Sequence, residues 1–218
     1  MAQTIYKSWF VDFEPWNGEQ PSDWHLGNLG DIAEAIYIGG TPNTNNSLYW
    51  DGGISWLSSG ETRSRFIIGT EKTITQQGVN NSSTKFAHRD DVVMASAGQG
   101  FTRGQTSFLL IDTYINQSVI AISGGIFAVY LFLNLIGRYE ELRAISDSSS
   151  IRGSITTKML AGFPMLIPTK DTIKEFSSLI WPLIDQIENN LLESANLAAL
   201  RNVLLPRLMS GELSFADL

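Results

Sequence analysis

The sequence contains no cysteine, so it can form neither a disulfide bond nor a thiolate metal site. Histidine is nearly absent: His25 and His88 are the two present, and their spacing fits neither a metal site nor a catalytic dyad. The first residues also lack the basic flank, apolar run and small-residue cleavage site of a secretion signal. We therefore expect a cytoplasmic protein whose histidines serve at the surface or in packing.

Catalytic motifs are missing as well. The sequence has no glycine loop followed by Lys and Ser or Thr, and no strand-linked dinucleotide fingerprint; residues 98–104 read GQGFTRG, which matches neither pattern. It also lacks the Asn-Pro-Pro-aromatic motif of amino-methyltransferases and the acidic cluster with Glu-x-Lys of many nucleases. We expect a binding protein that is not catalytic by itself and holds no cofactor or metal.

The stretch between Asp112 and Arg138 carries no charge and is long enough to span a bilayer. It is interrupted, however, by polar residues such as Asn116 and Asn134 and by a glycine pair, which a bilayer core penalises. These interruptions divide it into a short strand-like run and a helical run. We therefore expect no membrane span.

Net charge is −7, whereas phosphate contacts normally require a basic surface. The acidity is spread along the chain. Residues 21–168 hold ten Lys or Arg against twelve Asp or Glu, and residues 169–218 hold four against seven. Local patches can still face a phosphate backbone, but such a chain should bind DNA poorly alone and depend on a more basic partner.

Patterning divides the chain into an N-terminal arm (1–20), a strand-rich domain (21–168) and a long helix (169–218). The domain is predicted to be α+β, with a curved sheet and flanking helices. Short apolar or alternating runs predict strands at 54–57, 91–95, 108–111, 119–122 and 163–167. Residues 127–142 predict one buried helix, followed by a loop at 147–150. The aromatic residues of the arm predict that it packs on the edge of a core.

From Asp171 onward the apolar period is that of a helix. About 35 residues of helix, 174–208, would span roughly 50 Å. Pro182 is expected to kink or restart it. One interpretation is that the apolar stripe covers the domain's own sheet; the other is antiparallel coiled-coil pairing with a second copy or second half. The predicted seam consists of Phe176, Ile180, Leu183, Ile187, Leu191, Leu197 and Leu204.

Polar and basic residues beside glycines predict loops that contact DNA, because Asn, Gln and Arg read base edges while Ser and Thr hold phosphates. The candidates are Thr41, Asn43, Asn45, Ser58, Ser59, Arg63, Arg65, Arg103, Gln105, Arg152, Ser154 and Lys158. Arg103 and Arg152 are preferred, since arginine beside glycine approaches a phosphate or a guanine edge freely. Other interpretations stay open: residues 41–46 as a solvated turn, Tyr49, Trp50 and Trp56 as core, and 116–117 as partners of buried backbone groups.

Two end segments, YKSWFVDFEP (6–15) and LAALRNVLLPRLMSGEL (197–213), frame this domain. Between them lie Trp24, GGTP (39–42), LYW (48–50), ISWLSSGE (54–61), ITQQG (74–78), NSS (81–83), INQ (115–117), GSI (153–155) and Ile167-Pro168. In order and spacing the chain resembles the DNA specificity subunit of type I restriction-modification systems. The resemblance covers one target recognition domain and one conserved helical region, as in a half-length subunit or the C-terminal half of a longer one.

This resemblance implies a function and partners. The recognition domain would read one half of a split site in double-stranded DNA, and paired helices would hold two domains apart as a homodimer. A methyltransferase subunit with S-adenosylmethionine and a restriction subunit using ATP and Mg²⁺ would supply the chemistry. The alternatives are a structural or interaction protein that oligomerises through its helix, and a DNA-binding regulator that acts alone.

Overall fold

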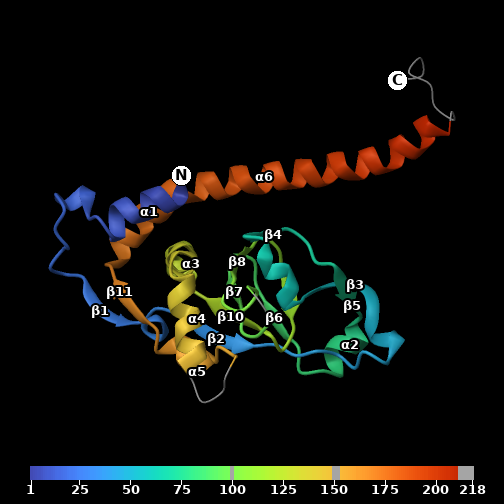
Figure 1. The fold of residues 1–218 in the computed structure, drawn as a ribbon, viewed down its shortest axis with the longest axis horizontal. Helices are drawn as coiled ribbons and strands as arrows, with labels where there is room; N and C mark the ends of the chain where they lie inside the picture. The colour runs from blue at the N-terminus through green and yellow to red at the C-terminus, as the bar shows by residue number, and fades with distance from the viewer. Residues whose placement is uncertain (99–100, 149–152, 211–218) are drawn as a thin grey trace. The chain divides into compact units, whose positions relative to one another are not determined.

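The computed structural model describes residues 1–98, 101–148 and 153–210 (Figure 1). The chain divides into two compact units, Met1–Ile180 and Trp181–Leu218. All strands of the described ranges belong to the first unit, and the helix α6 (Lys170–Met209) begins in the first unit and continues into the second. The α+β class predicted from the sequence is confirmed, and the strands are distributed over three sheets.

The largest sheet has five strands in the order β2 (Ala35–Ile38), β10 (Val119–Ser123), β7 (Val92–Ala95), β8 (Thr106–Leu109) and β4 (Phe66–Ile67). Its neighbours are antiparallel except β4 and β8, which are parallel. Every residue of β7 and β8 is buried. The uninterrupted apolar runs in β7 and β10 therefore form the centre of the sheet, covered on both faces.

The second sheet contains β5 (Lys72–Ile74), β3 (Trp50–Leu57), β9 (Thr113–Ile115) and β6 (Lys85–Ala87) in that order. A third pairs β1 (His25–Asn28) with β11 (Pro164–Ile167). Strand β3 changes register between Trp50 and Ile54, where Asp51 and Gly53 take positive φ angles of 59° and 81°. Residues from both larger sheets form one core cluster: Leu57, Ile67, Ala87, Val93, Leu109, Ile115, Val119 and Ala121.

The predicted strands all occur, with small shifts: 54–57 lies within β3, 91–95 and 119–122 match β7 and β10, 108–111 is displaced to β8, and 163–167 matches β11. The short strands β1, β2, β4, β5, β6 and β9 were not predicted. Each has two to four residues. A strand of this length is recognisable from the sequence only when it forms a continuous apolar run, as β7 does, and most of these strands include polar residues.

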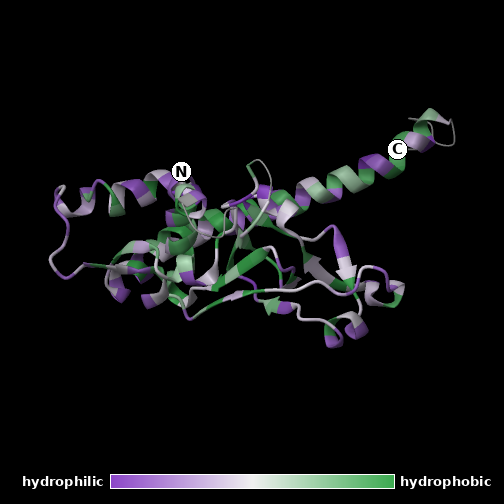
Figure 2. Cartoon of the chain, turned by 60° about the horizontal axis from the view of Figure 1, so that its bottom comes forward, coloured by the Kyte–Doolittle hydropathy of each residue, from purple (hydrophilic) through white to green (hydrophobic). Residues whose placement is uncertain are grey.

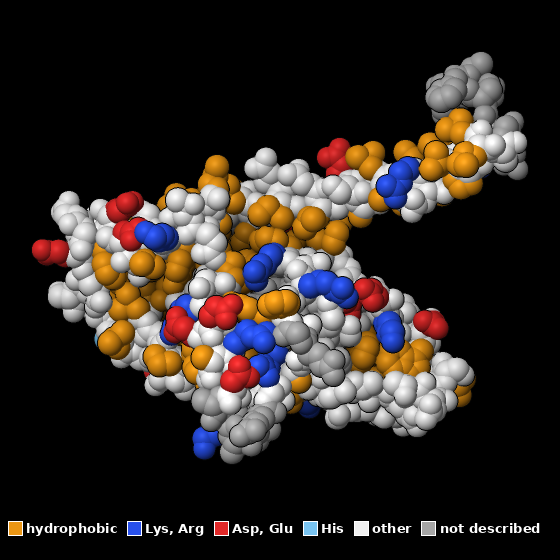
Figure 3. Space-filling model, in the orientation of Figure 1, with side chains coloured by type: hydrophobic (Ala, Val, Ile, Leu, Met, Phe, Trp, Pro, Cys, Tyr) orange, Lys and Arg blue, Asp and Glu red, His pale blue; other side chains and the backbone are white. Residues whose placement is uncertain are grey.

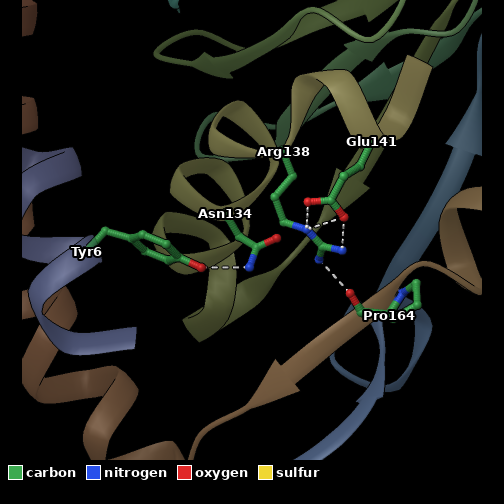
Figure 4. A network of polar contacts seen from close by, with 5 residues as sticks. All are labelled: Tyr6, Asn134, Arg138, Glu141 and Pro164. Carbon is green, nitrogen blue, oxygen red and sulfur yellow. Dashed lines mark hydrogen bonds and ion pairs between the residues drawn. The ribbon is translucent and has the colours of Figure 1, made fainter. Parts of the chain in front are cut away.

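The single helix predicted for 127–142 was wrong: α3 (Ala128–Gly137) and α4 (Tyr139–Ser148) are separated at Arg138. Gly137 has low helix propensity. The Arg138 guanidinium donates to Pro164 O at 2.6 Å and to Glu141, so the break joins β11 to the start of α4 (Figure 4). The loop predicted at 147–150 was also misplaced, since 147 and 148 end α4 and the remainder lies outside the described residues.

Helix α1 (Ala2–Phe10) is fixed to the first unit by an aromatic cluster, as the arm's composition predicted. Tyr6 and Phe10 are buried and surround Phe176 of α6, with the Phe10 and Phe176 ring centroids 4.8 Å apart. The Tyr6 hydroxyl accepts a hydrogen bond from Asn134 Nδ2 at 2.7 Å (Figure 4). Burial raises the pKa of Tyr6 to about 12, so its hydroxyl stays protonated at neutral pH.

Two residues of the predicted helix seam therefore belong to a core. Phe176 and Ile180 are fully buried in the first unit, so they were wrongly placed in a seam for a second copy. Their apolar side chains fit the heptad pattern because a core-facing stripe and a coiled-coil seam share nearly the same period. The hydropathy colouring of Figure 2 shows apolar and polar residues alternating along this helix.

Helix α6 continues through Pro182, so of the two outcomes predicted there, a kink or a restart, the restart does not occur. Proline removes one backbone hydrogen bond, and the turns on either side supply enough others for the helix to continue. Beyond this point, large apolar side chains are exposed at Leu192, Leu197, Leu200 and Val203, with Leu197 at 58%.

Among the described residues, no helix has the length and apolar content needed to cross a membrane.

Replacing Phe176 by alanine is expected to lower the free energy of unfolding by about 3–5 kcal/mol, because it leaves a cavity within the aromatic cluster. Urea denaturation followed by tryptophan fluorescence measures this. The matched control is Leu26→Ala, at a leucine 82% exposed on β1, and should change stability by less than about 0.5 kcal/mol. Equal effects of the two substitutions would show that the cluster does not anchor α6.

Candidate nucleic-acid interface

The strand registers bring most of the predicted DNA-binding segments to one end of the two larger sheets. Strand β2 ends beside the start of β10, where Ile38 pairs with Ile120. Strand β7 ends where β8 begins, with Met94 paired to Thr106. Strand β3 ends beside the end of β9, with Leu57 paired to Ile115. We call this edge the loop end and define it as residues 39–46, 58–65, 101–106, 116–118 and 153–154.

Backbone hydrogen bonds connect these segments. Ser96 N donates to Ser118 O at 2.8 Å and Ile155 N donates to Ser96 O at 2.7 Å, next to a bridge between Ala97 and Ser154. Ser107 Oγ donates to Ser64 O at 2.6 Å. Segments far apart in sequence are thus held as one rigid edge, the kind of support on which recognition loops are usually mounted.

Segment 39–46 is fixed at its base and open at its tip. A Cβ on Gly39 would lie 1.9 Å from Ile115 O, so only glycine fits there. The buried Trp56 donates its Nε1–H to Gly40 O at 3.3 Å, which confirms the core interpretation of this tryptophan. Thr41 Oγ1 donates to Gln117 Oε1. Asn43 and Asn45 are exposed, and Asn43 Oδ1 accepts from Asn45 N at 3.0 Å, so the Asn45 amide and Asn43 Nδ2 are the groups available to a ligand.

Segment 58–65 is held by the buried carboxylate of Glu61. Glu61 Oε2 accepts from Ser58 N and Ser58 Oγ, both at 2.8 Å, and Oε1 accepts from Glu71 N at 2.8 Å. Ser58 is therefore already engaged, and Ser59 is half-buried. Arg63 and Arg65 are exposed; Arg63 Nε donates to Gly60 O at 2.7 Å.

Arg103, a preferred candidate from the sequence, is buried rather than free in an open loop. It is 8% exposed, and its guanidinium is ion-paired with Asp147 at the end of α4. The sequence placed 147 in a loop, so this helix-borne partner was not foreseen. In this arrangement Arg103 stabilises the loop end from its buried side. It could contact DNA directly only if its ion pair with Asp147 were broken.

The remaining candidate DNA-binding residues lie in different parts of the fold. Gln105 and Ser154 are half-buried at the loop end, and Gln105 Oε1 has no hydrogen-bond partner among the described residues. Lys158 is exposed on α5 (Thr157–Ala161), which packs against β2. Arg152 lies outside the described residues. Asn116 is buried, and its Oδ1 accepts from Ser118 N at 2.9 Å, so it satisfies a backbone group as one interpretation predicted.

No pattern in the sequence indicated the group formed by Tyr139 and Arg143 of α4 with Phe101, which lies between β7 and β8. Tyr139 Oη donates to Phe101 O at 2.7 Å and accepts from Arg143 Nη1 at 2.9 Å. The Arg143 guanidinium lies 6.0 Å from the Phe101 ring, which is 79% exposed. The hydrogen bond to Tyr139 raises the pKa of Arg143 above its usual value. Spacing on the sequence gives no signal for this group, because 101 and 139–143 meet only through the fold.

Charge at the surface is mixed. On the face drawn in Figure 3, Lys and Arg side chains are interspersed with Asp and Glu rather than gathered in one stripe. A hollow of about 510 Å³ shows the same mixture, with Arg63 beside Glu61 and Glu71. In the described parts of the chain, no three His, Cys, Asp or Glu residues are placed to hold a metal ion. The loop end therefore has hydrogen-bonding groups for a ligand but little long-range attraction for phosphate.

The family described as Type I restriction modification DNA specificity domain matches residues 21–197. The Type I restriction enzyme MjaIX specificity subunit of Methanocaldococcus jannaschii is 21% identical over 235 residues, covering 100% of this chain and 53% of that protein. The HindI specificity subunit of Haemophilus influenzae is 22% identical, covering 88% and 42%. The chain thus spans about half the length of the curated relatives it matches.

Solved structures give the same picture of the fold. The HsdS subunit from Thermoanaerobacter tengcongensis has a TM-score of 0.59 at 17% identity, over 97% of this chain and 50% of that one. The Type-I restriction-modification system S subunit from M. genitalium has a TM-score of 0.66 at 15% identity, over 95% and 53%. The architecture of strand-rich sheets and long helix is therefore shared.

Glu61→Ala should destabilise the loop end specifically, because it leaves the amides of Ser58 and Glu71 without their acceptor. We expect a loss of about 1–3 kcal/mol in unfolding free energy. Hydrogen exchange by NMR should show faster exchange of those two amides. Glu19→Ala, an exposed carboxylate of the N-terminal arm, is the control and should leave both amides unchanged. Unaltered exchange in Glu61→Ala would mean that other contacts hold this segment.

Proposed function

The chain belongs to the type I restriction-modification DNA specificity family, and from this premise we propose that it is the sequence-reading component of such a complex. Its substrate would be double-stranded DNA, and its loop end would read one half of a split target site. The observation that carries the proposal is the convergence of five polar segments on a rigid sheet edge in a chain of this family.

Direct readout is supported by the residues that the loop end leaves exposed. Asn43 and Asn45 carry the amide groups that pair with adenine, and Arg63 and Arg65 carry the forks that pair with guanine or phosphate. Gln117 is exposed beside Thr41 and adds a further amide. Arg143 and Phe101 join this set, in place of the buried Arg103.

Helix α6 would pair two copies of the chain. After removal of Phe176 and Ile180, the proposed seam consists of Leu183, Ile187, Leu191, Leu197 and Leu204. The first three are half-buried and Leu197 is exposed. Figure 3 shows apolar side chains on the surface of this part of the helix. We propose that it pairs antiparallel with a second copy, so that a homodimer presents two loop ends to a palindromic split site.

The chemistry would come from other subunits. We propose a methyltransferase subunit that binds S-adenosylmethionine and a restriction subunit that uses ATP and Mg²⁺, both acting at the site that this chain selects. This chain would be a cytoplasmic, non-catalytic component that binds no cofactor itself. Its net charge of −7 supports dependence on partners, because the weak attraction for phosphate must be supplemented by their basic surfaces.

Arg63→Ala combined with Arg65→Ala should weaken binding of the assembled complex to the DNA site that it methylates by at least about tenfold, since each lost contact costs about 1–3 kcal/mol. Quantitative footprinting measures this. Each single variant is also compared with the control Arg89→Ala, which likewise removes one positive charge, near the opposite end of β8, where Asp90 N donates to Leu109 O. Undiminished protection in the double variant would exclude the 58–65 segment from the interface.

Leu197→Asp with Leu204→Asp should convert a dimer into a folded monomer, because two charges would enter the apolar seam. Light scattering coupled to size exclusion measures the mass. The matched control is Leu192→Asp with Val203→Asp, which introduces the same charge at outer heptad positions of the same helix. The seam proposal fails if the first variant stays dimeric or if both variants dissociate equally.

A further inference from the structure

Two lysines lie on the edge strands of the second sheet, beside the loop end. The strand order β5-β3-β9-β6 places Lys72, the first residue of β5, on one edge and Lys85, the first residue of β6, on the other (Figure 1). Lys72 is paired with Trp56, one residue before the end of β3, and Lys85 is paired with Ile115, the last residue of β9. We call Lys72 and Lys85 the flanking lysines, because β3 and β9 both end at the loop end.

Segment 39–46 crosses the end of this sheet over its two inner strands. Gly40 N donates to Ile115 O of β9 at 3.0 Å, and Gly40 O accepts from Trp56 Nε1 of β3 at 3.3 Å. The base of the segment is therefore hydrogen-bonded to both inner strands, at the level at which the flanking lysines lie on the outer strands.

Each end of the segment approaches one flanking lysine. On the β6 side, a Cβ on Gly40 would lie 2.2 Å from Ser83 Oγ, in the residues that lead to Lys85. On the β5 side, Thr44 lines a hollow of about 270 Å³ together with Lys72. The path of the segment thus runs from the neighbourhood of one lysine to that of the other.

The separation of the flanking lysines is comparable to the width of a DNA groove. Three strand spacings of about 4.8 Å place their Cα atoms roughly 14 Å apart. They lie in neighbouring rows of the sheet, so their side chains leave opposite faces. The major groove is about 12 Å wide, and in it an asparagine amide can recognise adenine. Two lysines at this separation can contact phosphates on both sides of a groove that segment 39–46 enters.

The flanking lysines also keep their charge available to a ligand. Other basic residues of the first unit, such as Arg103 and Arg138, are ion-paired with carboxylates. Both flanking lysines are exposed, and neither is ion-paired within the part of the chain that the structure describes, which includes Asp51 in the hollow beside Lys72. Lys72 Nζ lies 5.8 Å from the ring centroid of Trp50, and an aromatic face orients an ammonium group without neutralising it.

We propose that Lys72 and Lys85 bind DNA phosphates on the two sides of the groove that segment 39–46 enters. This inference rests on the proposed function and adds to it the residues that position the DNA without selecting bases. A lysine ammonium attracts a phosphate as a point charge, whatever the neighbouring base. The flanking lysines would therefore hold the duplex in place while the asparagine amides between them read it. They supply contacts at short range, where the mixed surface charge gives little attraction at a distance.

The salt dependence of DNA binding tests the proposal. Lys72→Gln combined with Lys85→Gln is assembled into the complex, and fluorescence anisotropy measures its affinity for a duplex with the site that the complex methylates and for a duplex without it. Each lost phosphate contact lowers the slope of log affinity against log salt concentration by about 0.9 for each copy of the chain. We expect the double variant to lose about twice this amount on both duplexes, with the ratio of the two affinities unchanged.

Two further variants separate position from charge. Lys170→Gln removes one charge from an exposed lysine that lines a hollow with Glu34 and Gly124, at the end of β2 and β10 opposite the loop end. It is compared with each single flanking variant and should leave the slope unchanged. Lys72→Arg combined with Lys85→Arg keeps both charges and should keep the full slope. A loss in Lys170→Gln as large as in a single flanking variant would contradict the assignment.

The same assay distinguishes this inference from the proposed function. Asn43→Ala combined with Asn45→Ala should lower the preference for the methylated site and leave the slope unchanged, because these side chains carry no charge. If the wild-type complex prefers its site and the double lysine variant keeps the full slope, the flanking lysines contact no phosphate and this inference alone fails. If the wild-type complex shows no preference between the two duplexes, the proposed function fails and this inference fails with it.

Discussion

Burial of β7 and β10 at the centre of the five-stranded sheet is the constraint on which the rest of the first unit depends. Both strands are continuous apolar runs, and the four residues from Val119 to Ile122 have no exposed surface. A strand covered on both faces has its register strongly specified, because a slip would displace every packed side chain. That register determines which loops meet, since the end of β7 and the starts of β8 and β10 fall on the same edge. The loop end is thus brought together by core packing and then connected by the hydrogen bonds among its segments.

The long helix depends on a second contact of the same kind. Phe176 in α6 is enclosed by Tyr6, Trp9 and Phe10 of α1, so the two ends of the first unit are joined in one aromatic cluster. The first turns of α6 therefore belong to the core of the first unit.

Much of the fold could be predicted from the sequence, and the failures have physical causes. Long or strongly apolar segments such as β3, β7, β10 and α6 were recognisable by period and length. Most other strands of two to four residues were not, because tertiary pairing rather than local pattern creates them. The break at Arg138 depends on a carbonyl of β11 that no local rule can supply. For the same reason the sequence could not show that Arg103 is buried against Asp147, which is 44 residues away, or that Phe101, Tyr139 and Arg143 lie together.

The central claim is that the loop end contacts DNA. Hydrogen exchange of the chain within its assembled complex, measured with and without the DNA that the complex methylates, tests this most directly. The account predicts slower exchange in segments 39–46 and 58–65 when DNA is added, and no change around Asp90 and Asp112 at the other end of the sheet. Protection confined to the residues around Asp90 and Asp112, with both loop segments unaffected, would contradict it.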